Sequence, residues 1–228
     1  MTAQPPAEPG QREPTVGWCA PELAEELPEL RLISCEALTM RPQALTSASP
    51  SDVRARLRTF SNRFGGARAI GLRREPLPAA YRVFFRQIGL DPDAVPTPIE
   101  AAVHERMLRG EFRTAGLLDD VLLIALLDTT IPVWALDADA VDGPLGIRAS
   151  TAEERLGRSA DAPALPAGRL VVADSSSPLA ILFGELAPGH TPVAATRRLT
   201  LFSIAVAGVP GLYAEEALWS CRAALEQS

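Results

Sequence analysis

The chain has 228 residues, a formal net charge of −6 and a hydrophobic content of 47%. This length and composition predict one large domain, or two small subdomains, able to bury a sizeable core. No apolar run is long enough to span a membrane, and residues 1–15 contain no signal-peptide core. Cys19, Cys35 and Cys221 lack a paired spacing, which argues against a disulfide framework or structural zinc site and favours a cytoplasmic location.

The charge is unevenly distributed along the chain. Residues 51–90 contain nine arginines against Asp52 and Glu75, a net charge of +7, which leaves −13 for the rest of the chain. The chain has no lysine, so every basic side chain is arginine, which suits phosphate and carboxylate recognition. The acidic total argues against indiscriminate nucleic-acid binding. The basic segment can therefore be a binding surface or an ordinary solvated face.

The first part of the chain combines a proline-rich tail with the first elements of the fold. Residues 1–16 are expected to form a disordered tail, and residues 17–228 the folded domain. The apolar spacing predicts a short helix over residues 21–27, and a loose alternation predicts a strand over residues 30–38.

Capping and stop signals predict the helices that follow. Ser49 before Pro50 is typical of a helix start, and this helix is expected to run through about residue 64. A loop is expected over residues 73–78. The next helix, over residues 79–88, has aromatic side chains at the spacing of a core face.

A second capping box, formed by Thr97 and Glu100, opens a helix that is expected to end near Arg109. The apolar run at residues 114–127 predicts a buried central helix, around which the domain packs. Turn residues then separate five predicted strands, at residues 132–136, 145–148, 169–173, 179–184 and 199–207. A helix over residues 214–226 closes the chain, which gives an α+β fold, with helices in the N-terminal half and sheets in the C-terminal half.

Motifs for dinucleotide binding, phosphate binding, zinc proteolysis and a nucleophile elbow are missing, so no cofactor or metal is expected. Asp119 and Asp120 form a candidate carboxylate pair. On a helix they point about a quarter-turn apart, which favours capping or pairing with arginine over a shared metal. His190 lies in a predicted loop, where it could transfer protons or be incidental.

Two groups of segments carry a resemblance to a known family. The first is residues 77–92 (LPAAYRVFFRQIGLDP) with the helix start at residues 97–101 (TPIEA). The second joins residues 117–119 (LLD), 131–137 (IPVWALD) and 170–174 (LVVAD). Together they resemble the tRNA-binding B3/B4 domain of the phenylalanyl-tRNA synthetase β subunit. They are most similar to the small proteins that consist of this domain alone, over about residues 17–226.

The resemblance implies a three-layer α+β domain, in which sheets pack on each other and on helices. In the synthetases, a pocket in this region hydrolyses wrongly charged tRNA. Asp119 and Asp137 match acids of the family, and Thr196 matches the threonine before the last core strand.

Other positions depart from the family pattern. Leu122 and its neighbours replace a polar stretch, and Trp134 stands where the family has a histidine. Residues 201–203 (LFS) stand near the place of a polar or acidic residue. Residues 184–192 (GELAPGHTP) replace a turn rich in Trp, Arg and Asp. The resemblance therefore implies the fold more strongly than the chemistry.

Three functions follow as hypotheses. The first is tRNA binding, for which the candidate phosphate contacts are Arg73, Arg74, Arg82 and Arg86. The second is hydrolysis of misacylated aminoacyl-tRNA, for which the candidate polar groups are Asp119, Asp120, His190 and Thr196. The third is a degenerate domain that binds an amino acid or a protein partner, with Trp134 and Asp137 at the pocket. In that case Trp134 lines the pocket; alternatively, Trp134 is an ordinary core residue. The sequence does not indicate the oligomeric state.

Overall fold

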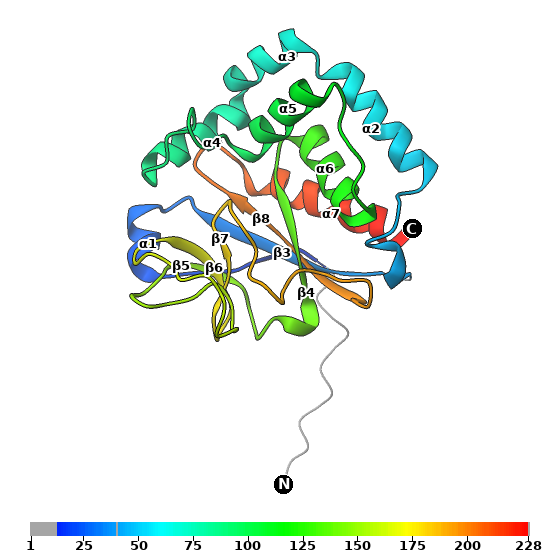
Figure 1. Cartoon of the computed structure of the whole chain (residues 1–228). Coiled ribbons are helices and arrows are strands. Elements are labelled where there is room, and N and C mark those ends of the chain that lie inside the picture. Colours follow the sequence, from blue (N-terminus) through cyan, green and yellow to red (C-terminus); the bar gives the residue numbers. More distant parts are fainter. Residues whose placement is uncertain (1–12, 40, 228) are drawn as a thin grey trace.

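Two four-stranded sheets and a set of helices make up the structure, a computed structural model that describes residues 13–39 and 41–227 (Figure 1). The strand orders are β1-β3-β8-β4 in the first sheet and β2-β5-β6-β7 in the second. Most helices precede the C-terminal strands. The predicted α+β class is therefore confirmed.

The first sheet is antiparallel throughout. Its strands are β1 (Thr15–Val16), β3 (Arg31–Leu38), β8 (Arg198–Ala205) and β4 (Val133–Asp137). In β3 the residues Ile33, Cys35 and Ala37 are buried, whereas Ser34 and Glu36 are only partly buried. Because successive side chains point to opposite faces, the two faces of this sheet differ in polarity.

The second sheet contains one parallel pair, between its first two strands, and is otherwise antiparallel. Its strands are β2 (Trp18–Cys19), β5 (Gly146–Ala149), β6 (Leu170–Ala173) and β7 (Pro178–Ile181). Figure 1 shows β5, β6 and β7 on one side of β3 and β8, with most helices on the other side.

The helices of the described residues are α1 (Pro21–Glu26), α2 (Ser51–Arg63), α3 (Gly66–Gly71), α4 (Pro76–Gln87), α5 (Pro98–Arg109), α6 (Leu117–Thr129) and α7 (Gly211–Gln227). Short 3₁₀ helices are η1 (Pro42–Ala44), η2 (Leu72–Arg74) and η3 (Ala138–Ala140). The closing helix α7 packs on β3, β8 and α6. Within the described part of the chain, no helix is both long and apolar enough to cross a bilayer.

The predicted buried helix followed by a buried strand is confirmed as α6 and β4, joined through the fully buried Ile131. One hydrophobic cluster combines side chains of both sheets with those of α4, α6 and α7. A second cluster lies between α2, α5 and the other side of α6. The burial of α6 on two sides explains why its apolar residues do not form a single stripe.

Two helix starts differ from the prediction. Helix α2 begins after Pro50, and Ser49 does not cap it, because the Ser49 hydroxyl donates to Oδ2 of Asp120 over 2.5 Å. The expected loop over residues 73–78 is replaced by the end of η2 and the first turn of α4. Prolines fit this first turn, where a missing N–H removes no helical hydrogen bond.

The ordered fold begins before residue 17. Of the predicted tail, residues 1–12 lie outside the described residues, while Thr15 and Val16 pair with β3 as β1. The chain then passes through Gly17 into β2 of the second sheet. Each of these strands has two residues, which is too short for a periodicity to identify.

Candidate functional site

Three of the predicted site residues meet at the end of β4. The Asp137 carboxylate accepts a hydrogen bond from Oγ1 of Thr196 over 2.6 Å through Oδ2, and from the amide of Asp139 over 3.1 Å through Oδ1. The amide of Asp137 donates to the carbonyl of His190 over 2.9 Å. These contacts hold the loop between β7 and β8 against the end of β4.

The His190 ring is enclosed by this loop. Its Nδ1 lies 3.3 Å from the carbonyl oxygen of Pro188, and its buried Nε2 has no hydrogen-bond partner among the described residues. The ring is therefore shielded from solvent in this conformation, and its exposed fraction is 4%.

The two aspartates of α6 have different surroundings. Asp120 is buried, and its carboxylate accepts from the Ser49 hydroxyl over 2.5 Å and from the amide of Ala115 over 2.9 Å. Asp119 is exposed at its side chain. The pKa of Asp119 is raised, first because nearby protein displaces water from the carboxyl group and second because Asp120 carries a like charge. Asp120 thus holds the start of α6, and no described contact joins either aspartate to Asp137 or His190.

Trp134 lies in an aromatic stack on β4. Its ring is stacked on Phe202 of β8, with centroids 5.4 Å apart and planes at 14°, and meets Phe183 edge-on at 5.7 Å. Trp134, where the resemblance implies a histidine, is therefore in direct contact with Phe202, one of residues 201–203, which stand near the place of a polar or acidic residue. The two rings form an apolar surface where the resemblance implies polar groups.

An apolar pocket of about 340 Å³ opens beside this stack. Its lining residues are Pro96, Pro98, Ala101, Leu122, Leu123, Leu126, Pro132, Val133, Trp134 and Phe183. None of these side chains can donate or accept a proton at neutral pH. Asp137, the other predicted pocket residue, lies at the opposite end of β4 and does not line this pocket.

Phe183 is a pocket residue that the sequence analysis did not identify. Its φ angle of +59° lies in the left-handed region, which is strained for a bulky side chain. Its ring also contacts Tyr81, Phe84 and Phe85 of α4, at centroid distances of 5.6, 5.7 and 5.3 Å. These contacts hold the ring in place, and the following Gly184 was the only signal of a turn in the predicted strand.

The candidate phosphate contacts on η2 and α4 divide into buried and exposed arginines. Arg82 is buried, with Nη1 2.7 Å from Oε1 of Glu100 and Nη2 2.8 Å from Oδ1 of Asp93. Arg73 is exposed but reaches both acids at 3.1 Å. Hydrogen bonding from Arg82 lowers the pKa of Asp93. The guanidinium group of Arg82 is therefore engaged by acids of the protein itself, and Arg82 has a structural role.

Arg74 and Arg86 remain exposed. Helix α2 adds Arg54, Arg58 and Arg63, which are exposed and form no ion pair within the described residues. The guanidinium of Arg63 lies over the ring of Phe60, 5.4 Å from its centroid. We refer to Arg54, Arg58 and Arg63 as the α2 arginines. Arg54 and Arg58 are four residues apart, so they lie on the same face of the helix.

No family model matches the chain. Parts of it are similar to phenylalanine–tRNA ligase beta subunits: 37% identical over 97 residues in Xylella fastidiosa, 37% over 106 residues in Xanthomonas oryzae pv. oryzae and 39% over 88 residues in Xanthomonas campestris pv. campestris. The alignments cover 41%, 46% and 39% of this chain, but only 12%, 11% and 10% of those subunits. The chain is therefore related, over part of its length, to a small region of the phenylalanine–tRNA ligase beta subunit.

Proposed function

We propose that the chain is a B3/B4-type domain that binds tRNA and does not hydrolyse the aminoacyl ester. The observation that carries this proposal is the partial identity with the beta subunits of a tRNA ligase. The arrangement of helices on one face of the first sheet, with the second sheet on its other face, supports the three-layer B3/B4 fold (Figure 1).

Exposed arginines supply the phosphate contacts in this proposal. The α2 arginines, together with Arg74 and Arg86, are exposed and form no ion pair within the described residues, so their guanidinium groups are available to a polyanion. Binding of this kind releases counterions and depends on salt. Because the chain as a whole is negatively charged, it repels RNA from the rest of its surface. RNA binding is therefore restricted to the region of these exposed arginines.

The absence of hydrolysis is inferred from the Trp134 pocket. Ester hydrolysis needs a positioned water and a group that stabilises the developing oxyanion. The pocket is lined by apolar side chains, and the carboxylates of Asp120 and Asp137 are held by hydrogen bonds outside it. Such a pocket accommodates an apolar group without attacking it.

Fluorescence anisotropy with labelled tRNA tests the binding surface. The double variant Arg54→Ala with Arg58→Ala is compared with Arg41→Ala with Arg197→Ala, which also removes two exposed arginines. We expect the first pair to weaken binding about tenfold and the second pair to leave it nearly unchanged. Equal losses in both variants, or no binding of the wild type at low salt, would contradict the proposal.

Release of the amino acid from charged tRNA tests the second part. We expect the wild-type rate to equal the rate in buffer alone. Faster release that disappears in His190→Ala, Asp119→Ala or Thr196→Ala would instead establish an ester hydrolase and would overturn the non-hydrolytic assignment.

The Trp134 pocket favours a second function, the binding of an apolar or aromatic amino acid. Its volume of about 340 Å³ and its apolar lining are typical of small-molecule pockets. Isothermal titration with phenylalanine is expected to show saturable heat in the wild type and none in a folded Trp134→Ala variant. Equal heats in both proteins would place the ligand elsewhere.

A further inference from the structure

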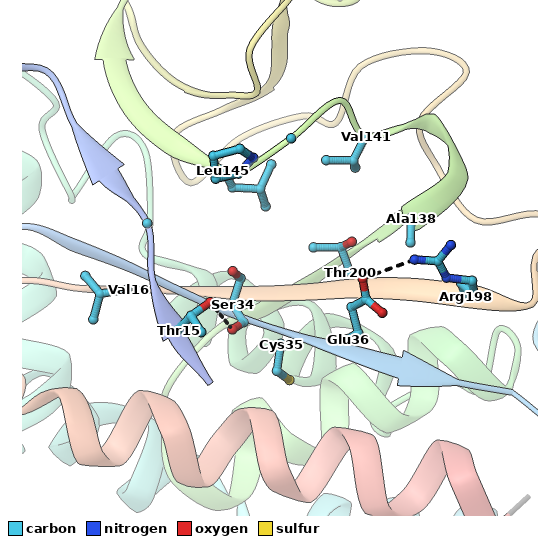
Figure 2. A pocket seen from close by; sticks show the side chains of 13 residues that line it. Thr15, Val16, Ser34, Cys35, Glu36, Ala138, Val141, Leu145, Arg198 and Thr200 are labelled. Carbon is cyan, nitrogen blue, oxygen red and sulfur yellow. Dashed lines mark hydrogen bonds and ion pairs between the residues drawn. The ribbon is translucent and has the colours of Figure 1, made fainter. Parts of the chain in front are cut away.

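A second pocket, lined by both polar and apolar residues, lies between the first sheet and the segment that leads from β4 to β5 (Figure 2). Its volume is about 380 Å³. Ser34 and Glu36 of β3 and Arg198 and Thr200 of β8 form its floor. Figure 2 shows these side chains on the pocket side of the strands, whereas Cys35 points toward α7.

The walls of this inter-sheet pocket come from two backbone segments. One wall is Thr15–Val16 with Gly17, and the other includes Val141, Gly143 and Leu145. A Cβ atom at Gly17 would lie 2.3 Å from the carbonyl oxygen of Leu145, so the two walls meet in close backbone contact. The pocket is therefore bounded by ordered segments on both sides.

The floor offers polar groups that the fold leaves available. The hydroxyls of Ser34 and Thr200 make no side-chain hydrogen bond to any part of the chain that the structure describes. Both residues are partly exposed to the pocket. A concave site with a few convergent polar groups is the usual form of a small-molecule site.

Charges of both signs stand next to these hydroxyls. Arg198 lies 3.2 Å from Glu36 and 3.4 Å from Asp139, and all three side chains are partly exposed. Charge-assisted hydrogen bonds are usually shorter than this, and exposed ion pairs contribute little to stability. A charged ligand can therefore replace the Glu36–Arg198 ion pair at a small cost in free energy.

We propose that the inter-sheet pocket binds a small zwitterion, whose carboxylate pairs with Arg198 and whose ammonium pairs with Glu36. An anion alone would meet the charges of Glu36 and Asp139, and a cation alone would meet Arg198. A zwitterion satisfies both signs, and the hydroxyls of Ser34 and Thr200 can bond its polar side chain. This site is separate from the arginines of α2, η2 and α4 that are proposed to contact tRNA.

Titration of the ¹⁵N-labelled full chain with serine and glutamine tests the site, each beside its N-acetyl and carboxamide derivative. The amides of Gly17 and Gly143 report on the pocket walls, and the indole of Trp134 reports on the apolar pocket. We expect saturable shifts at the two glycines for at least one free amino acid, and binding about tenfold weaker for derivatives that lack either charge. The absence of saturable shifts at these glycines below about 10 mM would overturn the proposal.

Charge-neutral variants give the matched control. Glu36→Gln and Arg198→Gln are expected to weaken binding about tenfold each. Glu105→Gln and Arg109→Gln remove the charges of an exposed ion pair on α5 and are expected to have no effect. Equal binding by all four variants would overturn the assignment. The Arg54→Ala, Arg58→Ala protein is expected to bind the zwitterion like the wild type. This result distinguishes the zwitterion site from the proposed tRNA surface.

Discussion

At the residue scale, Glu100 joins two arginines and the threonine at the start of α5. Its Oε1 accepts from Arg82 at 2.7 Å and lies 3.1 Å from Nε of Arg73, while its Oε2 accepts from the amide and hydroxyl of Thr97 at 3.2 and 2.8 Å. The predicted capping box is therefore confirmed. The sequence could not indicate that the same carboxylate neutralises a buried arginine, because α4 and α5 meet only in the folded chain.

This ion pair gives the first prediction. Arg82→Ala leaves the buried Glu100 without its closest cation, so we expect the free energy of unfolding to fall by about 3 kcal/mol. Arg73→Ala removes an exposed partner of the same acid and should cost about 1 kcal/mol or less. Urea unfolding of both variants checks this. Similar small losses would show that Arg82 is not buried in solution.

The second prediction separates the two aspartates of α6. Asp120→Ala removes the acceptor of the Ser49 hydroxyl and the Ala115 amide, and we expect a loss of about 2 kcal/mol in the free energy of unfolding. Asp119→Ala should change it by about 0.5 kcal/mol or less. Thermal and urea unfolding measure both. A neutral Asp120→Ala variant would argue against the structural role of this carboxylate.

The third prediction concerns the pH dependence of Asp119. Since its pKa is raised in the folded state, the folded protein holds this proton more tightly than the unfolded chain does. The resulting stability is fully present below the unfolded pKa of about 3.9 and is lost as the pH rises through the folded pKa. Asp119→Asn should therefore match the wild type near pH 3 and be more stable at pH 7. Urea unfolding curves of both proteins at pH 3 and pH 7 test this prediction. An Asp119→Asn variant that is less stable than the wild type at pH 7 would contradict the raised pKa of Asp119.

At the element scale, local patterns identify the long elements and miss contacts between distant segments. Capping predicts α5, a dense apolar run predicts α6, and apolar runs flanked by turn residues predict β4 and β8. The pattern cannot find β1 and β2, whose two-residue pairings are set by β3 and β5. It also cannot foresee that Trp134 stacks on Phe202, because this contact requires the register of β4 against β8.

The fourth prediction tests the close approach of the two sheets. In Gly17→Ala the new Cβ would lie 2.3 Å from the Leu145 carbonyl oxygen, a backbone atom that cannot rotate away. We expect the free energy of unfolding to fall by about 2 kcal/mol or more. Gly71→Ala is the control, since this helical position has open space and should gain about 0.5 kcal/mol. Equal effects in the two variants would contradict the described approach of β2 to the β5 segment.

At the scale of the whole molecule, the candidate sites lie at different places in the fold. The α2 arginines are on the helical side, and the Trp134 pocket is at the edge strand β4 (Figure 1). The inter-sheet pocket lies on the face of the first sheet that carries Ser34 and Thr200, and the strand register assigns the Trp134 ring to this same face (Figure 2). The charge pattern of the sequence predicted a basic segment. It did not show that ion pairs with Asp93, Glu100 and Asp128 neutralise part of it.

The salt dependence of tRNA affinity tests the central proposal most directly. If about five arginines contact phosphates, the logarithm of the association constant should fall with the logarithm of salt concentration with a slope of roughly −4. The slope should be smaller in the Arg54→Ala, Arg58→Ala variant and unchanged in the Arg41→Ala, Arg197→Ala control. A flat salt response, or no binding at low salt, would contradict a tRNA-binding function.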